Sequence, residues 1–300
     1  KRLAEPTLPG IGTGKQNLAI KVGKNLYKDE WGVVKKWHPS SGMFHYEKHP
    51  LSEITDPLAI KDYPFPDPSK SERYIEVKNG VAKYGKNYPV LCETWNFFKS
   101  AWELRGFEQL MMDLYLNPDL VEALLDRLFV YKKIELQNLI NSGIDIFQLS
   151  GDIAMQYSMM INPQIWRQYF KPRYHYLIQE FKNVSKVKFM FHSDGYLEPV
   201  IDDLIEVGFD IINPIQPESL NVEDIKRKYG DKVCLHGSIS IQQTLPFGTS
   251  NDVQQEVEER IKVLGQGYGF ILAPSNTVLP DVPIENILVL YNASRQRGVY

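Results

Sequence analysis

From Tyr88 onward, short apolar runs alternate with longer stretches of helical periodicity, and this alternation restricts the possible folds more than any other feature of the chain. Strands that are apolar on both faces suit a sheet covered by helices, and their alternation with helices favours a parallel sheet. We predict six strands: Pro89–Glu93, Ile144–Leu149, Val187–Phe191, Phe209–Asn213, Lys232–Gly237 and Gly269–Ala273.

The helices between these strands are expected to begin at capping residues and to end at glycines. The predicted caps are Asn117-Pro118-Asp119, Asn162-Pro163, Asn221-Val222-Glu223-Asp224 and Ser250-Asn251-Asp252, and the predicted terminal glycines are Gly143, Gly208 and Gly230.

The first 85 residues follow a different pattern. Asn17 to Val22 and Gly32 to Trp37 are β-like, His38-Pro39-Ser40-Ser41-Gly42 indicates a turn, and Asp62 to Ser71 is predicted to be an extended connector. An eight-stranded barrel needs two strands beyond the six, and they could lie in this part or in sequence outside the chain.

These patterns predict an α/β fold, a TIM-type (β/α)8 barrel with an irregular, β-containing N-terminal segment. Such barrels run to ~250 residues in one domain, so we expect residues 1–300 to form a single domain, irregular over 1–85 and built of regular βα units over 86–300. A doubly wound open sheet is the competing architecture, but no glycine-rich phosphate loop follows any predicted strand.

Composition excludes several classes of function. A net charge of -3 argues against nucleic acid or an anionic membrane as the main partner. No apolar run approaches the ~20 residues that cross a bilayer, and no signal peptide is visible. The two cysteines, Cys92 and Cys234, suit a reducing cytoplasm, which is the expected location.

Polar residues follow the predicted strands at the ends where barrel enzymes carry their chemistry, and we expect them to converge on one mouth. They are Glu93 and Trp95, Gln148 and Asp152, His192 and Asp194, Asn213 and Gln216, His236 and Ser238, and Ser275 and Asn276.

His192 and Asp194 end a buried run and lie two residues apart, so both can reach one ion or one substrate group. Imidazole and carboxylate are both zinc ligands, and a catalytic zinc needs about three protein ligands and an open position. The alternative is a buried histidine satisfied by Asp194 or by a backbone carbonyl. Glu93 could act as an acid or base or complete the metal site, and its alternative is a salt bridge to an arginine such as Arg105.

His236 lies inside a strand, where a substrate contact and a core or supporting role are about equally expected. Cys234 alternates with His236 and is expected to share its face, but a buried, inert thiol is the favoured interpretation.

Several blocks in order resemble the uroporphyrinogen decarboxylase superfamily, and two weaker ones resemble its methyltransferase-like branches. The blocks are His192-Ser-Asp-Gly-Tyr-Leu-Glu-Pro with the residues up to Gly208, Asn213-Pro-Ile-Gln-Pro, Lys228-Tyr-Gly-Asp-Lys-Val-Cys-Leu-His-Gly, Thr244-Leu-Pro-Phe-Gly-Thr, Ile271-Leu-Ala-Pro-Ser-Asn and Pro280-Asp-Val-Pro-Ile-Glu-Asn-Ile, and the weaker ones Asp29-Glu-Trp-Gly and Trp102-Glu-Leu-Arg-Gly. The resemblance implies a barrel and one of two chemistries: decarboxylation of porphyrinogens, or zinc-dependent methyl transfer between a corrinoid protein and an acceptor.

The resemblance to the decarboxylases is incomplete. Trp102 and Asn276 align where that family has a tyrosine and a histidine, and its arginine-rich motif for substrate carboxylates is not found. Without such cations, a substrate with eight carboxylates would be poorly held.

The resemblance to the methyltransferases is closer. Their zinc site is a His-x-Cys followed by a later cysteine; here His192 is kept, and Asp194 and Asn276 stand at the cysteine positions. Loss of the thiolates would make zinc a harder Lewis acid, which favours O- or N-methyl compounds over thiols.

These observations predict methyl transfer from a small O- or N-methyl compound to a corrinoid (cobalamin) carried by a partner protein. The predicted catalytic residues are His192, Asp194 and Glu93; the zinc ligands are His192 and Asp194, with Glu93 as a candidate third; the substrate-binding residues are Trp95, Gln148, Asp152, Asn213, His236 and Asn276. The alternatives are a uroporphyrinogen decarboxylase and a non-catalytic barrel that binds a small molecule.

Overall fold

The computed structural model describes residues 20–39 and 43–298. These residues group into two compact units: the C-terminal unit, residues 148–163 and 188–298, and the N-terminal unit, residues 20–147 and 164–187. The boundary falls within strand β6 (Ile146–Ser150).

Parallel strands form the sheet of the C-terminal unit. In order across the sheet they are β7 (Lys188–His192), β8 (Ile211–Asn213), β9 (Cys234–Ile239) and β10 (Phe270–Pro274). The end of β6 lies beside β7, because the Gly151 N–H donates to the His192 carbonyl oxygen at 3.2 Å. The register pairs His192 with Asn213, so these two strand-end side chains are neighbours.

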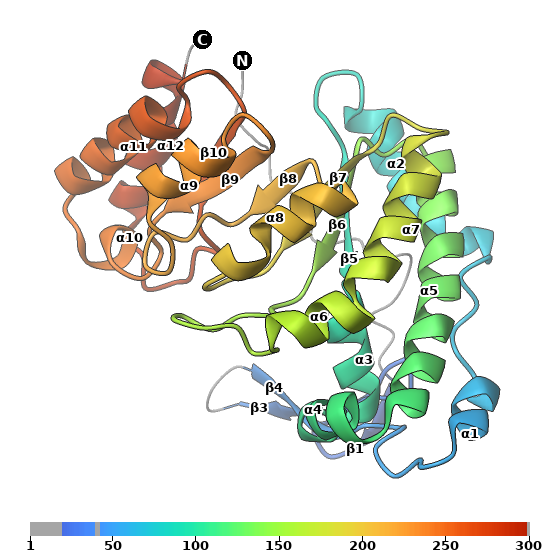
Figure 1. Ribbon diagram of the computed structural model, residues 1–300. Helices are drawn as coiled ribbons and strands as arrows, with labels where there is room; N and C mark the ends of the chain where they lie inside the picture. Colours follow the sequence, from blue (N-terminus) through green and yellow to red (C-terminus); the bar gives the residue numbers. More distant parts are fainter. Residues whose placement is uncertain (1–19, 40–42, 299–300) are drawn as a thin grey trace. The chain divides into compact units, whose positions relative to one another are not determined.

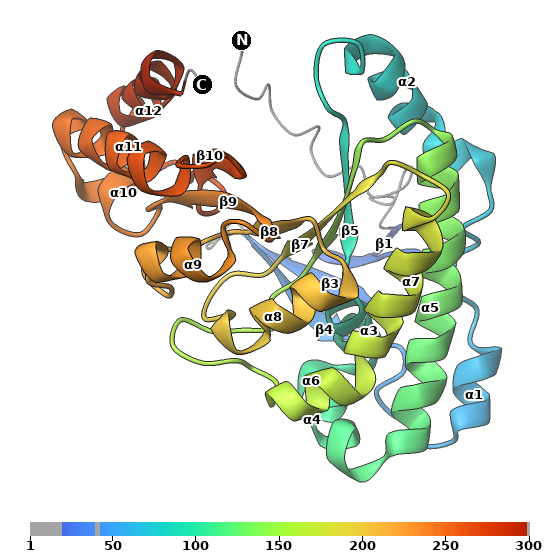
Figure 2. The same cartoon turned by 45° about the horizontal axis from the view of Figure 1, so that its top comes forward.

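Helices cover this sheet and bury its apolar side chains. They are α8 (Glu198–Val207), α9 (Val222–Tyr229), α10 (Thr244–Phe247), α11 (Ser250–Leu264) and α12 (Ile284–Arg297). Helices α11 and α12 lie side by side (Figures 1 and 2), and Val253 and Val257 of α11 pack with Leu290 of α12 and Ile239 of β9 in one buried cluster. This packing holds the end of β9 in place.

The N-terminal unit begins with an antiparallel sheet. Its order is β1 (Ile20–Gly23), β2 (Leu26–Lys28), β3 (Val34–His38) and β4 (Met43–Lys48). The elements that follow are α1 (Pro57–Asp62), the 3-10 helix η1 (Ser71–Tyr74), α2 (Ile75–Tyr84), β5 (Leu91–Trp95), α3 (Phe97–Arg105), α4 (Phe107–Leu116), α5 (Pro118–Asn141), α6 (Pro163–Tyr169) and α7 (Lys171–Lys182). The long α5 runs beside α7 (Figure 1), and β5 lies beside the start of β6, because the Asp145 and Ile146 N–H groups donate to the Val90 carbonyl oxygen at 2.9 and 3.2 Å.

The predicted α/β fold with parallel strands is confirmed, and each of the six predicted strands is present with bounds that differ by at most two residues. Asn117 and Asn221 occupy the N-cap positions of α5 and α9 as predicted, and the Asn221 side chain accepts from the Asp224 N–H, whereas the Asn117 side chain makes no capping hydrogen bond. Helix α11 begins at Ser250 as expected, but its cap is Thr249, which exchanges hydrogen bonds with Asp252 in a capping box. No described helix has the length and apolar composition needed to cross a membrane.

Other predictions were wrong. Gly143 and Gly208 have φ of +91° and +109°, the left-handed conformation expected after a helix; Gly230 ends α9 as predicted, but its φ of -66° is not left-handed. The strands described within the first 85 residues are antiparallel, so they do not supply the two further parallel strands of a barrel. Their sheet, with β2 and β4, is more regular than we expected; residues 17–19 and 40–42 of the predicted strand and turn lie outside the described residues.

Candidate active site

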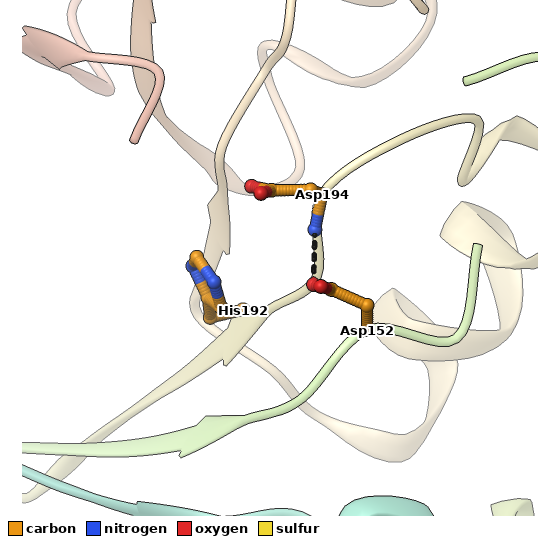
Figure 3. A group of neighbouring side chains, drawn as sticks. All are labelled: Asp152, His192 and Asp194. Carbon is orange, nitrogen blue, oxygen red and sulfur yellow. Dashed lines mark hydrogen bonds between the residues drawn. The ribbon is translucent and has the colours of Figure 1, made fainter. Parts of the chain in front are cut away.

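Three titratable side chains come together at the ends of β6 and β7. One nitrogen or oxygen atom from each of Asp152, His192 and Asp194 lies within 4.8 Å of the other two (Figure 3). The backbone N–H of Asp194 donates to Asp152 Oδ1 at 2.9 Å, which fixes the two loops to each other. We call these three residues the acid–histidine cluster.

Asp194 is the most constrained carboxylate of the cluster. Asn276 donates a hydrogen bond from Nδ2 to Asp194 Oδ2, whereas Asp194 Oδ1 is buried and accepts no hydrogen bond from the described residues. Burial raises the pKa of the Asp194 carboxyl above its usual 3.8; the nearby Asp152 also raises this pKa, while His192 and the Asn276 hydrogen bond lower it. A buried acceptor without a donor is costly, and a cation would remove that cost.

The orientation of His192 follows from a chain of hydrogen bonds through Asn213. His192 Nδ1 lies 2.5 Å from Asn213 Oδ1, and Asn213 Nδ2 lies 2.5 Å from His236 Nδ1. The amide oxygen can only accept and the amide nitrogen can only donate, so His192 carries its proton on Nδ1 and His236 is unprotonated at Nδ1. In the neutral form of His192, this tautomer places the lone pair on Nε2, and that form can bind a metal.

His236 is held neutral by its surroundings. Burial and, to a smaller extent, the nearby His192 lower the pKa of His236 to about 4. With Nδ1 accepting from Asn213, a neutral His236 presents an N–H at Nε2, and it can donate a hydrogen bond to a substrate but cannot attract an anion.

The loop after β7 is fixed by two further contacts. Ser193 Oγ accepts from the Ile153 N–H at 3.0 Å, and Gln216 Oε1 accepts from the Gly195 N–H at 2.9 Å. Gly195 has φ of +89°, and a Cβ there would lie 2.4 Å from the Met155 carbonyl oxygen, so only glycine fits. The cluster is therefore built on a rigid loop.

Among the predicted substrate-binding residues, Asn213, His236 and Asn276 support the cluster and Asp152 belongs to it. Both ends of the Asn276 amide are engaged, because its Oδ1 also accepts from the Thr277 N–H at 2.5 Å. Gln148 is buried and donates to Ser150 Oγ at 2.8 Å, and among the described residues no hydrogen bond is found between it and the cluster.

Glu93 and Trp95 belong to the N-terminal unit, where both line a cavity of about 820 Å³. Arg105, the expected alternative partner of Glu93, is instead buried against Asp113, with Nε 2.5 Å from Oδ2. The salt bridge between Glu93 and Arg105, which the sequence left open as an alternative, is therefore not found among the described residues.

Sequence reasoning missed two features, one in each unit. It placed Asp152 among the substrate-binding residues rather than with His192 and Asp194, and the signal was its position directly after β6. It also missed the cavity, whose walls include Asp29, Glu30 and Trp31 from a block that was quoted only for its resemblance.

A parallel α/β fold with histidine, carboxylate and amide side chains gathered at strand ends is the arrangement of α/β-barrel enzymes. The family described as uroporphyrinogen decarboxylase (URO-D) matches residues 49–297. The chain therefore belongs to the URO-D family, as the sequence blocks predicted.

Relatives with two different activities match at the same level. A uroporphyrinogen decarboxylase of Pseudoalteromonas translucida (strain TAC 125) is 24% identical over 260 residues, which cover 82% of this chain and 69% of that protein. A methylcobamide:CoM methyltransferase, MtaA, of Methanosarcina barkeri is 24% identical over 212 residues, 70% of this chain and 59% of that protein. Because the identities are equal, they do not decide between the two reactions.

Solved structures share the fold. A methyltransferase from Methanosarcina mazei superimposes with a TM-score of 0.72 at 20% identity and covers 90% of this chain and 77% of its own. A B12-independent methionine synthase from Shewanella sp. W3-18-1, in complex with selenomethionine, gives a TM-score of 0.53 at 14% identity and covers 74% of this chain and 67% of its own.

Proposed function

We propose that this URO-D family enzyme is a methyltransferase that moves a methyl group from a small O- or N-methyl compound to a corrinoid carried by a partner protein. The observation that carries the proposal is the acid–histidine cluster, with the unpartnered Asp194 Oδ1 and the free Nε2 of His192. The likeness to the Methanosarcina mazei methyltransferase and to the methylcobamide:CoM methyltransferase adds support.

The donor atoms fit zinc. Asp152, His192 and Asp194 offer one nitrogen and two carboxylate groups, the number of protein ligands that leaves a fourth position open. Asp152 replaces Glu93 as the third ligand in this proposal, since its oxygen lies with the other two. Bound there, zinc would supply a Lewis acid that polarises an ether oxygen or a neutral amine nitrogen carrying the methyl group; a quaternary nitrogen has no lone pair and needs no such activation.

The remaining residues orient and support these ligands. Asn213 holds the His192 ring in the tautomer that leaves Nε2 free, and Asn276 holds Asp194 through Oδ2 so that Oδ1 stays available. His236 stays neutral and can donate from Nε2 to an oxygen or nitrogen of the substrate. These are binding and positioning tasks that need no proton transfer within the cluster.

The reaction transfers the methyl carbon with its three hydrogens to the reduced cobalt of the partner's corrinoid, whose electron pair forms the new bond. The electrons of the broken bond remain with the oxygen or nitrogen. An alkoxide, or the anion left by a neutral methylamine, must then gain a proton from water, whereas a tertiary amine released from a quaternary ammonium needs none. Metal ligands that include no thiolate favour oxygen and nitrogen compounds as the molecules bound at the metal, rather than a thiol.

The test supplies reduced cobalamin with a panel of methyl ethers and methylamines, and uroporphyrinogen in a separate assay. Formation of methylcobalamin that disappears in His192→Ala supports the proposal. Decarboxylation of uroporphyrinogen without methyl transfer from any donor would instead identify a decarboxylase, and inactivity in both assays with retained ligand binding would identify a binding protein.

A further inference from the structure

The cavity of the N-terminal unit has the size of a small-molecule site. Its volume of about 820 Å³ falls in the ~300–1,000 Å³ range of ligand pockets. Its walls come from the antiparallel sheet and the segments next to it, from β5, and from α3 and α5. All of these elements belong to the N-terminal unit, so the cavity is complete within it.

Aromatic rings make up much of the wall. They are Tyr27, Trp31, Phe44, Tyr46, Trp95 and Tyr131. One side of this wall already stabilises an ammonium group of the protein itself: Lys99 Nζ lies 3.6 Å from the centre of the neighbouring Trp102 ring, 5.2 Å from that of Tyr46 and 5.3 Å from that of Trp95. Ring faces attract cations because their π electrons are negative.

Four of the five carboxylates in the wall are paired with a cation of the protein. Glu30 accepts two hydrogen bonds from Arg73 at 2.7 and 2.6 Å, and Glu135 pairs with Lys132 at 2.9 Å. The other two share a lysine, as Lys35 lies 3.6 Å from Glu103 and 4.0 Å from Asp29.

Glu93 is the fifth carboxylate and the exception, since no hydrogen bond or ion pair to its side chain is found among the described residues. The two lysines of the wall are already engaged: Lys35 with Glu103 and Asp29, and Lys132 with Glu135 and with Thr94 Oγ1 at 3.0 Å. The cavity therefore has one unpaired negative charge and no unpaired positive charge to offer a ligand.

We propose that this cavity binds a small methylated ammonium cation, with Glu93 as its counter-ion and the aromatic rings against its methyl groups. A neutral ligand would cover Glu93 without compensating its charge, and an anion would meet it as a like charge. This binding statement does not rest on the proposed function. In this role Glu93 is a binding residue.

The test measures binding by isothermal titration calorimetry on the whole chain. The probes are choline, its uncharged carbon analogue 3,3-dimethylbutanol and the anion 3,3-dimethylbutyrate. We expect choline to bind about tenfold more tightly than either analogue, because only choline gains the charge-assisted and cation–π contacts.

The decisive variant is Glu93→Gln, which keeps the shape of the side chain and removes its charge. Choline affinity is expected to fall about tenfold while 3,3-dimethylbutanol binding stays unchanged. Glu76→Gln, an exposed carboxylate on α2 outside the cavity, is the matched control and should bind choline like the wild type. Trp95→Leu removes a ring that is 46% exposed and hence dispensable for folding, and it should weaken choline binding as well.

Equal affinity for choline and its uncharged analogue, or unchanged choline binding in folded Glu93→Gln, would overturn the inference. Turnover of methyl ethers without any cation binding would contradict this inference and leave the proposed function intact. Selective choline binding without methyl transfer from any donor would contradict the proposed function alone.

Discussion

Asp194 and Glu93 look alike in the sequence, since both are carboxylates at the end of a predicted strand, yet the structure gives them different surroundings. Asp194 lies two residues after β7, next to His192 and Asp152, with one oxygen held by Asn276. Glu93 lies within β5, in the wall of an aromatic cavity, and has no partner among the described residues.

The comparison shows that the position at a strand end selects a residue for function but does not decide its chemistry. The neighbouring donor atoms decide it: an imidazole and a second carboxylate make Asp194 a candidate metal ligand, whereas aromatic rings make Glu93 a candidate counter-ion. If this is correct, the two tasks are separable by mutation.

His192→Ala is expected to have the largest effect. Removal of the only nitrogen ligand in the cluster should reduce zinc from about one equivalent to none after dialysis and lower methyl transfer by more than the ~10–100-fold typical of losing an outer partner. Zinc is measured by elemental analysis of the purified protein. His175→Ala, an exposed histidine on α7, is the control and should keep its zinc.

The same experiment tests the separation. His192→Ala should bind choline like the wild type, and Glu93→Gln should keep its zinc. Loss of zinc in folded Glu93→Gln would show that Glu93 is a ligand after all, and the contrast between the two carboxylates would be wrong.

Asn276→Ala is expected to have the next largest effect. Asn276 holds Asp194 Oδ2, and without that hydrogen bond the carboxylate loses its fixed orientation. Loss of such an outer partner costs ~10–100-fold in metal affinity, which competition with a zinc chelator measures. Asn251→Ala, at an exposed position on α11, is the control; unchanged affinity in Asn276→Ala would mean that the Asp194 loop is rigid without it.

Asp194→Cys would restore the His-x-Cys pattern of the methyltransferases that the sequence resembles. A thiolate softens the site, so cadmium should gain on zinc by roughly tenfold relative to the wild type. Competition between the two metals, followed by elemental analysis, gives the ratio. If the ratio does not change, residue 194 does not contact the metal.

How much the sequence could predict differs between the two regions. Buried β7, β8 and β9 were predicted from continuous apolar runs, because a strand covered on both faces has few other interpretations. The place of His192 and Asp194 followed from the end of such a run. The place of Asp152 was harder to predict. Its distance to Asp194 depends on the conformations of two loops that follow different strands, β6 and β7.

The cavity could not be predicted in the same way. Its wall combines short antiparallel strands with β5, α3 and α5, and it depends on contacts between residues such as Trp31 and Tyr131, whose rings lie 4.6 Å apart but which are far apart in the chain. Periodicity carries no information about such contacts. The paired state of Glu30 or Glu103 is equally invisible in the sequence, so Glu93 could not be recognised as the exception.

The smallest effect is expected for Cys234→Ser, and it sharpens the comparison by asking whether a thiolate completes the acid–histidine cluster. Cys234 begins β9, two residues before His236, and burial raises its pKa to about 11. At neutral pH the thiol therefore stays protonated, and it lies outside the group of atoms within reach of one ion.

We expect Cys234→Ser to have full zinc content and methyl transfer within about twofold of the wild type, as for substitutions that touch no special feature. A thiol reagent should react slowly at pH 7 and faster as the pH rises toward 11. Loss of zinc from folded Cys234→Ser would mean that a soft thiolate ligand persists in this chain, and a thiol acceptor would then replace the O- or N-methyl chemistry inferred from the oxygen-rich cluster.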